Sequence, residues 1–91
     1  MIGSFRHRGL EELFKTGKSR RVSADLRKRI QVRLDAIANA VNFKDLALPG
    51  LNFHPLVGKP KRYSIHVNSP WTITFGWEAG EAVDVDLEPY H

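Results

Sequence analysis

The chain has 91 residues, of which 42% are hydrophobic and 26% are charged. These values are typical of one small soluble domain, so we expect a single domain over residues 1–91 and exclude a disordered chain. No apolar run approaches the roughly 18 residues that cross a bilayer, and the N-terminus has no secretory signal. We therefore expect a cytoplasmic protein without membrane contact. The absence of cysteine excludes disulfides and thiolate metal sites.

Charge is distributed unevenly along the chain. Residues 1–44 hold eleven basic and four acidic side chains, residues 45–75 hold three and one, and residues 76–91 hold none and five. The basic part favours a polyanionic partner, because Lys and Arg side chains that contact phosphates release counterions. The acidic end favours a basic partner on another surface. The alternative is that these charges only solvate the faces of helices.

The N-terminal residues predict a short edge strand over residues 1–6 and a first helix over residues 7–15. Leu10, Leu13 and Phe14 follow helical spacing and form one apolar stripe. We expect this helix to end at Gly17, because glycine readily adopts the left-handed conformation that terminates helices.

Residues 23–40 carry the strongest helical pattern. We expect the Ser23 hydroxyl to cap this helix by accepting a hydrogen bond from a backbone amide of the first turn. The helix is both amphipathic and basic. Its apolar stripe is predicted to be Leu26, Ile30, Leu34, Ile37 and Val41, and its other faces carry Arg27, Lys28, Arg29 and Arg33.

After a predicted helical turn at residues 43–46, the apolar period changes from 3.6 to 2. Residues 63–67, 71–77 and 83–87 alternate apolar and polar side chains, which predicts three consecutive antiparallel strands. In the last strand, we expect Val83, Val85 and Leu87 to face the core. The sequence therefore predicts an α+β fold, with two N-terminal helices packed on one side of a mostly antiparallel C-terminal sheet. The other side of that sheet is expected to be polar and open.

Two histidines have settings that favour chemistry. His54 precedes Pro55, and the restricted backbone fixes where the imidazole points. His91 follows Tyr90 as the last residue, where its own carboxylate favours the protonated ring. Two imidazoles and a phenol can cleave RNA without a metal, since one group takes the proton of a 2′-hydroxyl and another protonates the departing 5′-oxygen. The nearby cations that could stabilise the phosphorane charge are Lys59, Lys61 and Arg62.

A metal site is the alternative on the polar sheet face. His66 is expected to share this face with Asp84 and Asp86, a set of ligands that could hold a metal ion. Alternating Asp residues are common on exposed strands, so we expect neither a metal nor another cofactor.

Several short motifs occur in a specific order along essentially the whole chain. They are Met1-Ile2 with Ser4-Phe5, Gly9-Leu10, Leu13-Phe14 with Gly17, the central amphipathic helix, Phe53-His54-Pro55-Leu56 with Gly58, Tyr63-Ser64-Ile65 with Val67, Trp71 with Ile73-Thr74-Phe75, and Tyr90-His91. Together these motifs resemble the HigB (host inhibition of growth) toxins. HigB toxins belong to the RelE-like superfamily of type II toxin–antitoxin systems.

The resemblance implies a RelE-like fold in which an N-terminal strand joins a mixed sheet. It also implies a ribosome-dependent mRNA interferase that cleaves messenger in the aminoacyl site of the 70S ribosome. A HigA-type helix-turn-helix antitoxin would neutralise it, and the toxin would reach operator DNA only through that antitoxin. By position, the catalytic residues are His54, Tyr90 and His91. The residues expected to bind RNA or the ribosome are Arg20, Arg21, Arg27, Lys28, Arg33, Lys59, Lys61 and Arg62.

The chain also departs from the family pattern. Family members commonly have Asp before the final Tyr-His, whereas this chain has Pro89, with Glu88 one position earlier. Basic residues common after His-Pro-Leu and around the Trp strand are replaced by Val57, Asn68 and Thr72. These changes remove positive charge from the predicted site and favour a weaker toxin.

Two other classes of function remain open from the sequence. One is a non-catalytic RelE-fold module that blocks translation or regulates its operon. The other is a ParE-like gyrase inhibitor, which His54 and the terminal Tyr-His disfavour.

Overall fold

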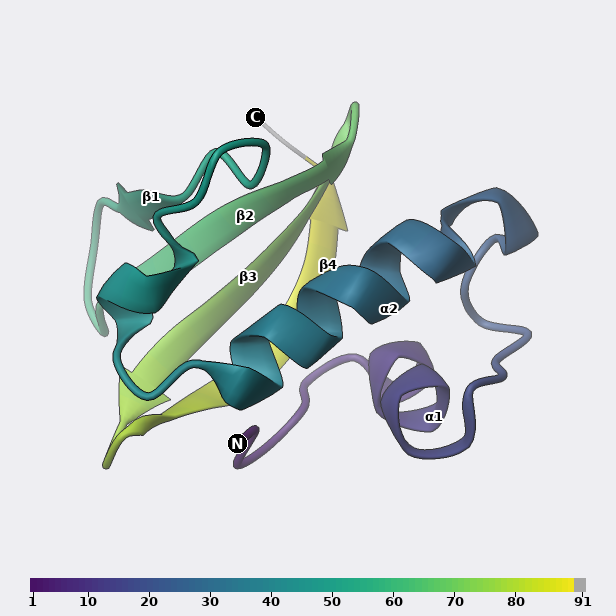
Figure 1. Ribbon diagram of the computed structural model, residues 1–91, viewed down its shortest axis with the longest axis horizontal. Coiled ribbons are helices and arrows are strands. Elements are labelled where there is room, and N and C mark those ends of the chain that lie inside the picture. The colour runs from purple at the N-terminus through teal and green to yellow at the C-terminus, as the bar shows by residue number, and fades with distance from the viewer. Residues whose placement is uncertain (90–91) are drawn as a thin grey trace.

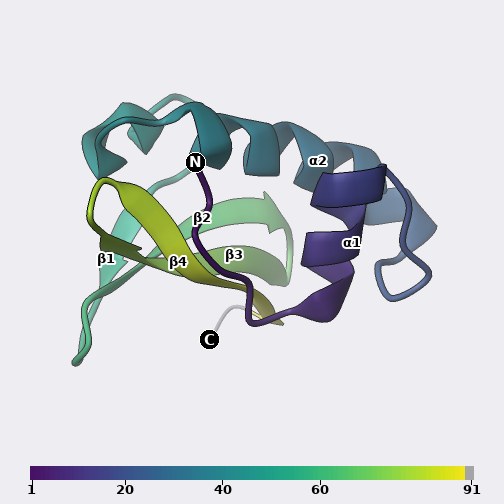
Figure 2. The same cartoon turned by 90° about the horizontal axis from the view of Figure 1, so that it is seen from below.

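A four-stranded antiparallel sheet and two helices make up the computed structural model, which describes residues 1–89 (Figure 1). The strand order is β1-β2-β3-β4, and both helices lie on one face of the sheet (Figure 2). This arrangement confirms the predicted α+β fold. The elements are α1 (Arg8–Thr16), α2 (Ala24–Asn39), the short 3₁₀ helix η1 (Phe43–Leu46), β1 (His54–Leu56), β2 (Arg62–Asn68), β3 (Trp71–Glu78) and β4 (Glu81–Pro89).

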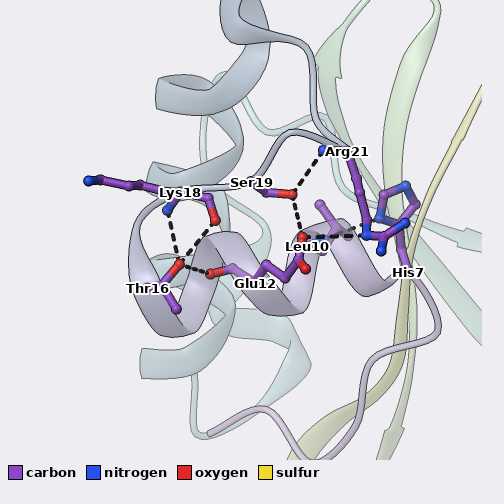
Figure 3. Close-up of polar contacts among 7 residues, drawn as sticks. All are labelled: His7, Leu10, Glu12, Thr16, Lys18, Ser19 and Arg21. Atoms are coloured by element: carbon purple, nitrogen blue, oxygen red, sulfur yellow. Dashed lines mark hydrogen bonds and ion pairs between the residues drawn. The ribbon is translucent and has the colours of Figure 1, made fainter.

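Helix α1 begins at Arg8, one residue later than expected. His7 is its N-cap, and the His7 Nδ1 accepts a hydrogen bond of 3.2 Å from the backbone N–H of Leu10 (Figure 3). Histidine is not among the preferred N-cap residues, so its type gave no signal for this role. Gly17 ends the helix with a φ of 78°, and its N–H donates to the Leu13 carbonyl at 2.9 Å. The predicted C-terminus of the helix is therefore confirmed.

Helix α2 confirms the predicted long helix, with a correction at each end. Ser23 is the N-cap, but its side chain makes no capping hydrogen bond; its backbone carbonyl accepts from the Leu26 N–H at 3.0 Å. Val41 is 80% exposed and lies outside the apolar stripe. The helix ends at Asn39 and the backbone of Ala40 is extended, so Ala40 is buried in place of Val41.

The predicted strands are present as β2, β3 and β4, and the predicted helical turn is η1. Strand β1, a three-residue strand that pairs antiparallel with β2, is an addition to the predicted elements. This strand is too short to show an alternating pattern, and it contains Pro55. Proline is tolerated there because β1 is an edge strand.

Residues 1–6 lie along β4 rather than forming a regular strand (Figure 2). Ile2 and Phe5 make isolated parallel bridges to Ala82 and Val85. The predicted N-terminal edge strand is thus reduced to two bridges, although it does join the sheet next to β4.

Strand β4 contains a bulge at Asp84. Gly76 of β3 pairs with Val83, whereas Thr74 pairs with Asp86, so β4 has one residue more than β3 over this stretch. Asp84 has a positive φ of 50°, which is uncommon for a residue with a side chain. Such an inserted residue bends the strand and redirects the side chains beside it.

Because of the bulge, the prediction that Val83 faces the core is wrong. Ala82 is fully buried in the core, whereas Val83 is half-buried and lies beside Gly76 on the opposite face. Val85 and Leu87 pack in or against the core as expected. An inserted residue moves the side chains that precede it to the other face, which a strict two-residue alternation does not predict.

The core lies between the two helices and the sheet face that they cover. It includes both helix stripes and the inward residues of β2, β3 and β4. No helix within residues 1–89 is both long and apolar enough to cross a membrane. The largest fully buried side chains are Leu10, Leu13, Ile30, Leu34, Ile37, Leu46, Ile65, Ile73 and Phe75.

Candidate active site

The face of the sheet that the helices leave open carries two rows of mostly polar side chains. Strand register places these residues opposite one another, because each pairs with a partner on the next strand. The predicted polar face is therefore confirmed. The first row is His54, Ser64, Thr74 and Asp86, and the second is His66, Thr72 and Glu88.

A hollow of about 320 Å³ opens on this face. Its walls include His54 and Pro89, which belong to strands at opposite edges of the sheet. A second hollow of about 320 Å³ adjoins the first, and the two share His54, Ser64 and Thr72. We call these two hollows together the groove. His66 lines its second part, so two imidazoles border one continuous surface.

The backbone around His54 is held from both sides. On the open face, His54 pairs with Ser64 through the β1–β2 ladder. On the covered face, the preceding residue Phe53 stacks on Tyr63, with ring centroids 5.5 Å apart and planes 13° apart. Tyr63 also stacks on Phe43 of η1 at 4.9 Å. These contacts fix the backbone of His54. Because the side chain is exposed, the imidazole is accessible to a ligand.

The floor of the groove is a hydrogen-bonded network that connects three strands. The Thr74 hydroxyl donates to Glu88 Oε2 at 2.8 Å, and Arg62 Nη2 donates to the same hydroxyl oxygen at 3.1 Å. The Thr72 hydroxyl donates to the Glu88 carbonyl at 3.2 Å. Glu88 is not among the site residues predicted from the sequence. Its place in the alternation of β4, on the same face as Asp86, was the available signal.

Arg62 is the predicted cation that reaches the groove floor. Partial burial and the nearby Arg6 lower the pKa of Arg62 from its usual value. The carboxylates of Glu88, Asp84 and Asp86 act in the opposite direction and favour its charged form. Arg62 is therefore a cation among three carboxylates, and it stays charged at neutral pH.

The other two predicted cations near His54 lie in the exposed loop between β1 and β2. Lys59 and Lys61 are both exposed. Lys61 and Arg62 border a further hollow of about 210 Å³, whose lining includes Gly76 and Val83. Both lysines are therefore accessible to solvent, and Lys61 lies beside Arg62 at this hollow.

The loop between α1 and α2, together with the start of α2, carries a separate basic surface, which we call the basic loop: Arg20 and Arg21 of the loop, and Arg27 and Lys28 of the helix. It lies at the opposite end of the molecule from β1 (Figures 1 and 2). Glu12 holds the loop to α1, because its Oε1 accepts a hydrogen bond of 2.8 Å from the Ser19 hydroxyl and lies 3.5 Å from Arg21 Nε (Figure 3). Arg20, Arg27 and Lys18 border a shallow hollow beside it.

Arg33, predicted to bind RNA or the ribosome, makes two hydrogen bonds within the protein. Its Nε donates a hydrogen bond of 2.6 Å to the His66 carbonyl, and its Nη1 donates to the Arg29 carbonyl at 3.1 Å. Burial, followed by the charge of Arg29, lowers its pKa. The guanidinium is thus directed to the back of a groove strand, apart from the basic loop.

The alternative metal site on this face has no support. No three His, Asp or Glu side chains among residues 1–89 lie close enough to hold a metal ion. Asp84 lies in the bulge, where its Oδ1 accepts a hydrogen bond from the Ser4 hydroxyl at 3.4 Å, and His66 shares a row with Glu88. Two of the predicted catalytic residues, Tyr90 and His91, lie outside the described residues.

Comparison with known proteins identifies the family. The family profile described as a RelE-like toxin of the type II toxin–antitoxin system HigB matches residues 3–91. The chain belongs to the HigB toxin family. It is also 40% identical over 92 residues to Endoribonuclease HigB of Proteus vulgaris, and the match covers the whole of both chains. These findings confirm the resemblance inferred from the motifs.

Membership in the HigB family makes this chain a type II toxin with an antitoxin partner, and the groove is the candidate active site of that toxin. The structure explains how one departure from the family pattern is accommodated. Thr72 is only 6% exposed and joins the groove floor through its bond to the Glu88 backbone. Val57, by contrast, is fully exposed at the groove wall.

Proposed function

We propose that this HigB-family toxin is a metal-independent mRNA interferase that cleaves translated messenger on the 70S ribosome. Endoribonuclease activity follows from family membership and from 40% identity with Endoribonuclease HigB over the whole chain. Dependence on the ribosome and independence of metal are the further steps of the proposal. Its place of action is the cytoplasm, where ribosomes translate messenger.

The observation that carries the proposal is that His54 and Pro89 line the same hollow. Tyr90 and His91 follow Pro89 directly in the sequence. The proposal therefore adds a phenol and a second imidazole to the His54 imidazole as the groups that carry out the chemistry. In the proposed reaction, one of these groups takes the 2′-hydroxyl proton and another protonates the departing 5′-oxygen, while Arg62 adds positive charge.

The groove itself supports dependence on the ribosome. Its lining is largely neutral and includes the Glu88 carboxylate, which repels RNA phosphates. A site with so little positive charge holds free RNA weakly, so positioning by the ribosome would supply much of the rate. The basic loop is the proposed anchor on ribosomal RNA, because its Lys and Arg side chains are separate from the groove and largely exposed.

The proposed antitoxin partner is a HigA-type helix-turn-helix protein. The type II family establishes that an antitoxin exists, and the acidic C-terminal part of this chain supports a basic contact surface on it. Operator DNA would be bound by the antitoxin, with the toxin attached only indirectly. Coexpression of the two genes, followed by copurification, tests this partner.

Mapping of messenger 5′ ends after induced expression tests the main proposal. We expect new 5′ ends within coding regions on ribosomes, with purified RNA left largely intact under the same conditions. The His54→Ala variant is the control for contaminating nucleases. Growth inhibition without new 5′ ends would favour the non-catalytic alternative, and induction of the DNA-damage response would favour the gyrase alternative.

A further inference from the structure

The Arg62 side chain crosses the open face of the sheet from β2 to β4. Its Nη2 donates to the Thr74 hydroxyl at 3.1 Å and to the Asp84 backbone carbonyl at 2.9 Å. These two bonds use both hydrogens of Nη2 and leave the N–H groups of Nε and Nη1 for other acceptors. Both acceptors are neutral, and no carboxylate among residues 1–89 forms an ion pair with this guanidinium. Its charge is therefore held in place but not neutralised by a direct contact.

The carbonyl that holds Arg62 belongs to the β4 bulge. In a regular ladder β4 would have one residue, not two, between Val83 and Asp86. The carbonyl of that residue would take part in the hydrogen bonds between the strands. The positive φ of Asp84 accompanies the bulge, and the Asp84 carbonyl accepts the Arg62 hydrogen bond from outside the ladder. Bulges commonly redirect groups beside active sites.

Ser4 braces this bulge from the N-terminal segment that runs along β4 (Figure 2). The Asp84 N–H donates to the Ser4 hydroxyl oxygen at 2.8 Å, and the same hydroxyl lies 3.4 Å from Asp84 Oδ1. The Val85 N–H donates to the Ser4 carbonyl at 3.1 Å. Ser4 thus accepts a hydrogen bond from the extra backbone N–H that the bulge exposes, and its hydroxyl also contacts the Asp84 carboxylate.

We infer that Ser4 is a positioning residue: by bracing the Asp84 bulge, it holds the Arg62 guanidinium where a phosphate of the bound messenger contacts it. Arg62 borders the 210 Å³ hollow and touches Thr74, which lines the groove. An RNA strand that continues from the groove into this hollow passes the guanidinium. Partial burial strengthens such a contact, because water screens it less.

This inference rests on the proposed function, and a double-mutant cycle of ribosome-dependent cleavage tests it. Arg62→Ala should lower the cleavage rate about 10- to 100-fold, the range for one lost charge-assisted hydrogen bond. It should also reduce the slope of log KM against log salt by about one. Ser4→Ala should lower the rate about 3- to 10-fold, since a shifted guanidinium still carries its charge. Ser4→Thr, which keeps the hydroxyl, should restore the rate.

The double variant of Ser4 and Arg62 distinguishes a positioning role of Ser4 from a general loss of structure. If Ser4 acts through Arg62, the double variant should be no slower than Arg62→Ala alone. Ser23→Ala is the matched serine control, since the Ser23 side chain caps nothing, and Arg8→Ala is the matched control for one exposed cation. Additive losses for Ser4 and Arg62, or an unchanged rate in Arg62→Ala while the parent toxin cleaves, would overturn the inference alone. Absence of ribosome-dependent cleavage in the parent and Arg8→Ala would overturn the proposed function.

Discussion

The Arg33 guanidinium on α2 donates a 2.6 Å hydrogen bond to the backbone carbonyl of His66 on β2. The His66 N–H donates to the Leu51 carbonyl at 2.7 Å, so both backbone groups of His66 are bonded outside the ladder. This point of β2 is also where its register with β3 shifts, between His66 and Asn68. The helix side chain therefore supports an irregular part of the groove strand.

Replacement of Arg33 by Ala should destabilise the protein rather than weaken ribosome binding. The loss of its hydrogen bond to the His66 carbonyl should lower the free energy of unfolding by about 1 kcal/mol. Lys28→Ala, on an exposed face of the same helix, should change it by less than about 0.5 kcal/mol. Urea denaturation followed by circular dichroism measures both. Equal stabilities would show that the Arg33 contact contributes nothing to the fold.

Replacement of His54 by Ala should abolish most of the cleavage without loss of stability. His54 is exposed, so the change removes no core packing, whereas the loss of one proton-transfer group costs about 10²–10⁴-fold in rate. Single-turnover cleavage on programmed ribosomes gives the rate. Val57→Ala, on the same groove and also exposed, should cleave like the parent. A His54→Ala rate within threefold of the parent would remove this residue from the chemistry.

Deletion of His91 should remove toxicity while leaving the fold intact. Val85 and Leu87 pack β4 in or against the core before the tail begins, so stability should change by no more than about 0.5 kcal/mol. A short tag appended after His91 should also impair cleavage, because it adds bulk next to a proposed catalytic residue. Growth curves with immunoblots compare toxicity at equal protein levels. Full toxicity in the deletion would shift the proposed chemistry to His54 and Tyr90.

Charge reversal in the basic loop should weaken ribosome association but not folding. The double change Arg20→Glu and Lys28→Glu keeps the contact of Arg21 with Glu12, and it keeps Arg27, whose Nε donates to the Val22 carbonyl at 3.1 Å. Association, measured by cosedimentation with ribosomes, should fall, and its dependence on salt should become less steep. Reversal of Arg8 and Lys44, exposed cations outside the loop, is the control for net charge. Unchanged association would mean that the basic loop is only solvated.

The helices could be predicted closely from the sequence because their signals are local. Leu26, Ile30, Leu34 and Ile37 are buried as their spacing requires, and Gly17 ends α1 with the left-handed backbone expected of glycine. The polar open face of the sheet followed from alternation in the same way. His54 could be singled out because proline restricts the residue that precedes it. Each of these signals depends on side chains within a few residues of one another.

Long-range pairing decided the rest. Because of the β4 bulge, Ala82 lies in the core in place of Val83. The extra residue of β4 is revealed only by the register between β3 and β4. The same pairing brings Glu88 to Thr74, and the bulge offers its carbonyl to Arg62. Composition does not distinguish one basic residue from another, but the His66 carbonyl, far along the chain, binds Arg33, whereas Lys28 is exposed. Backbone hydrogen bonds between distant segments make these choices, and the identity of neighbouring residues does not specify them.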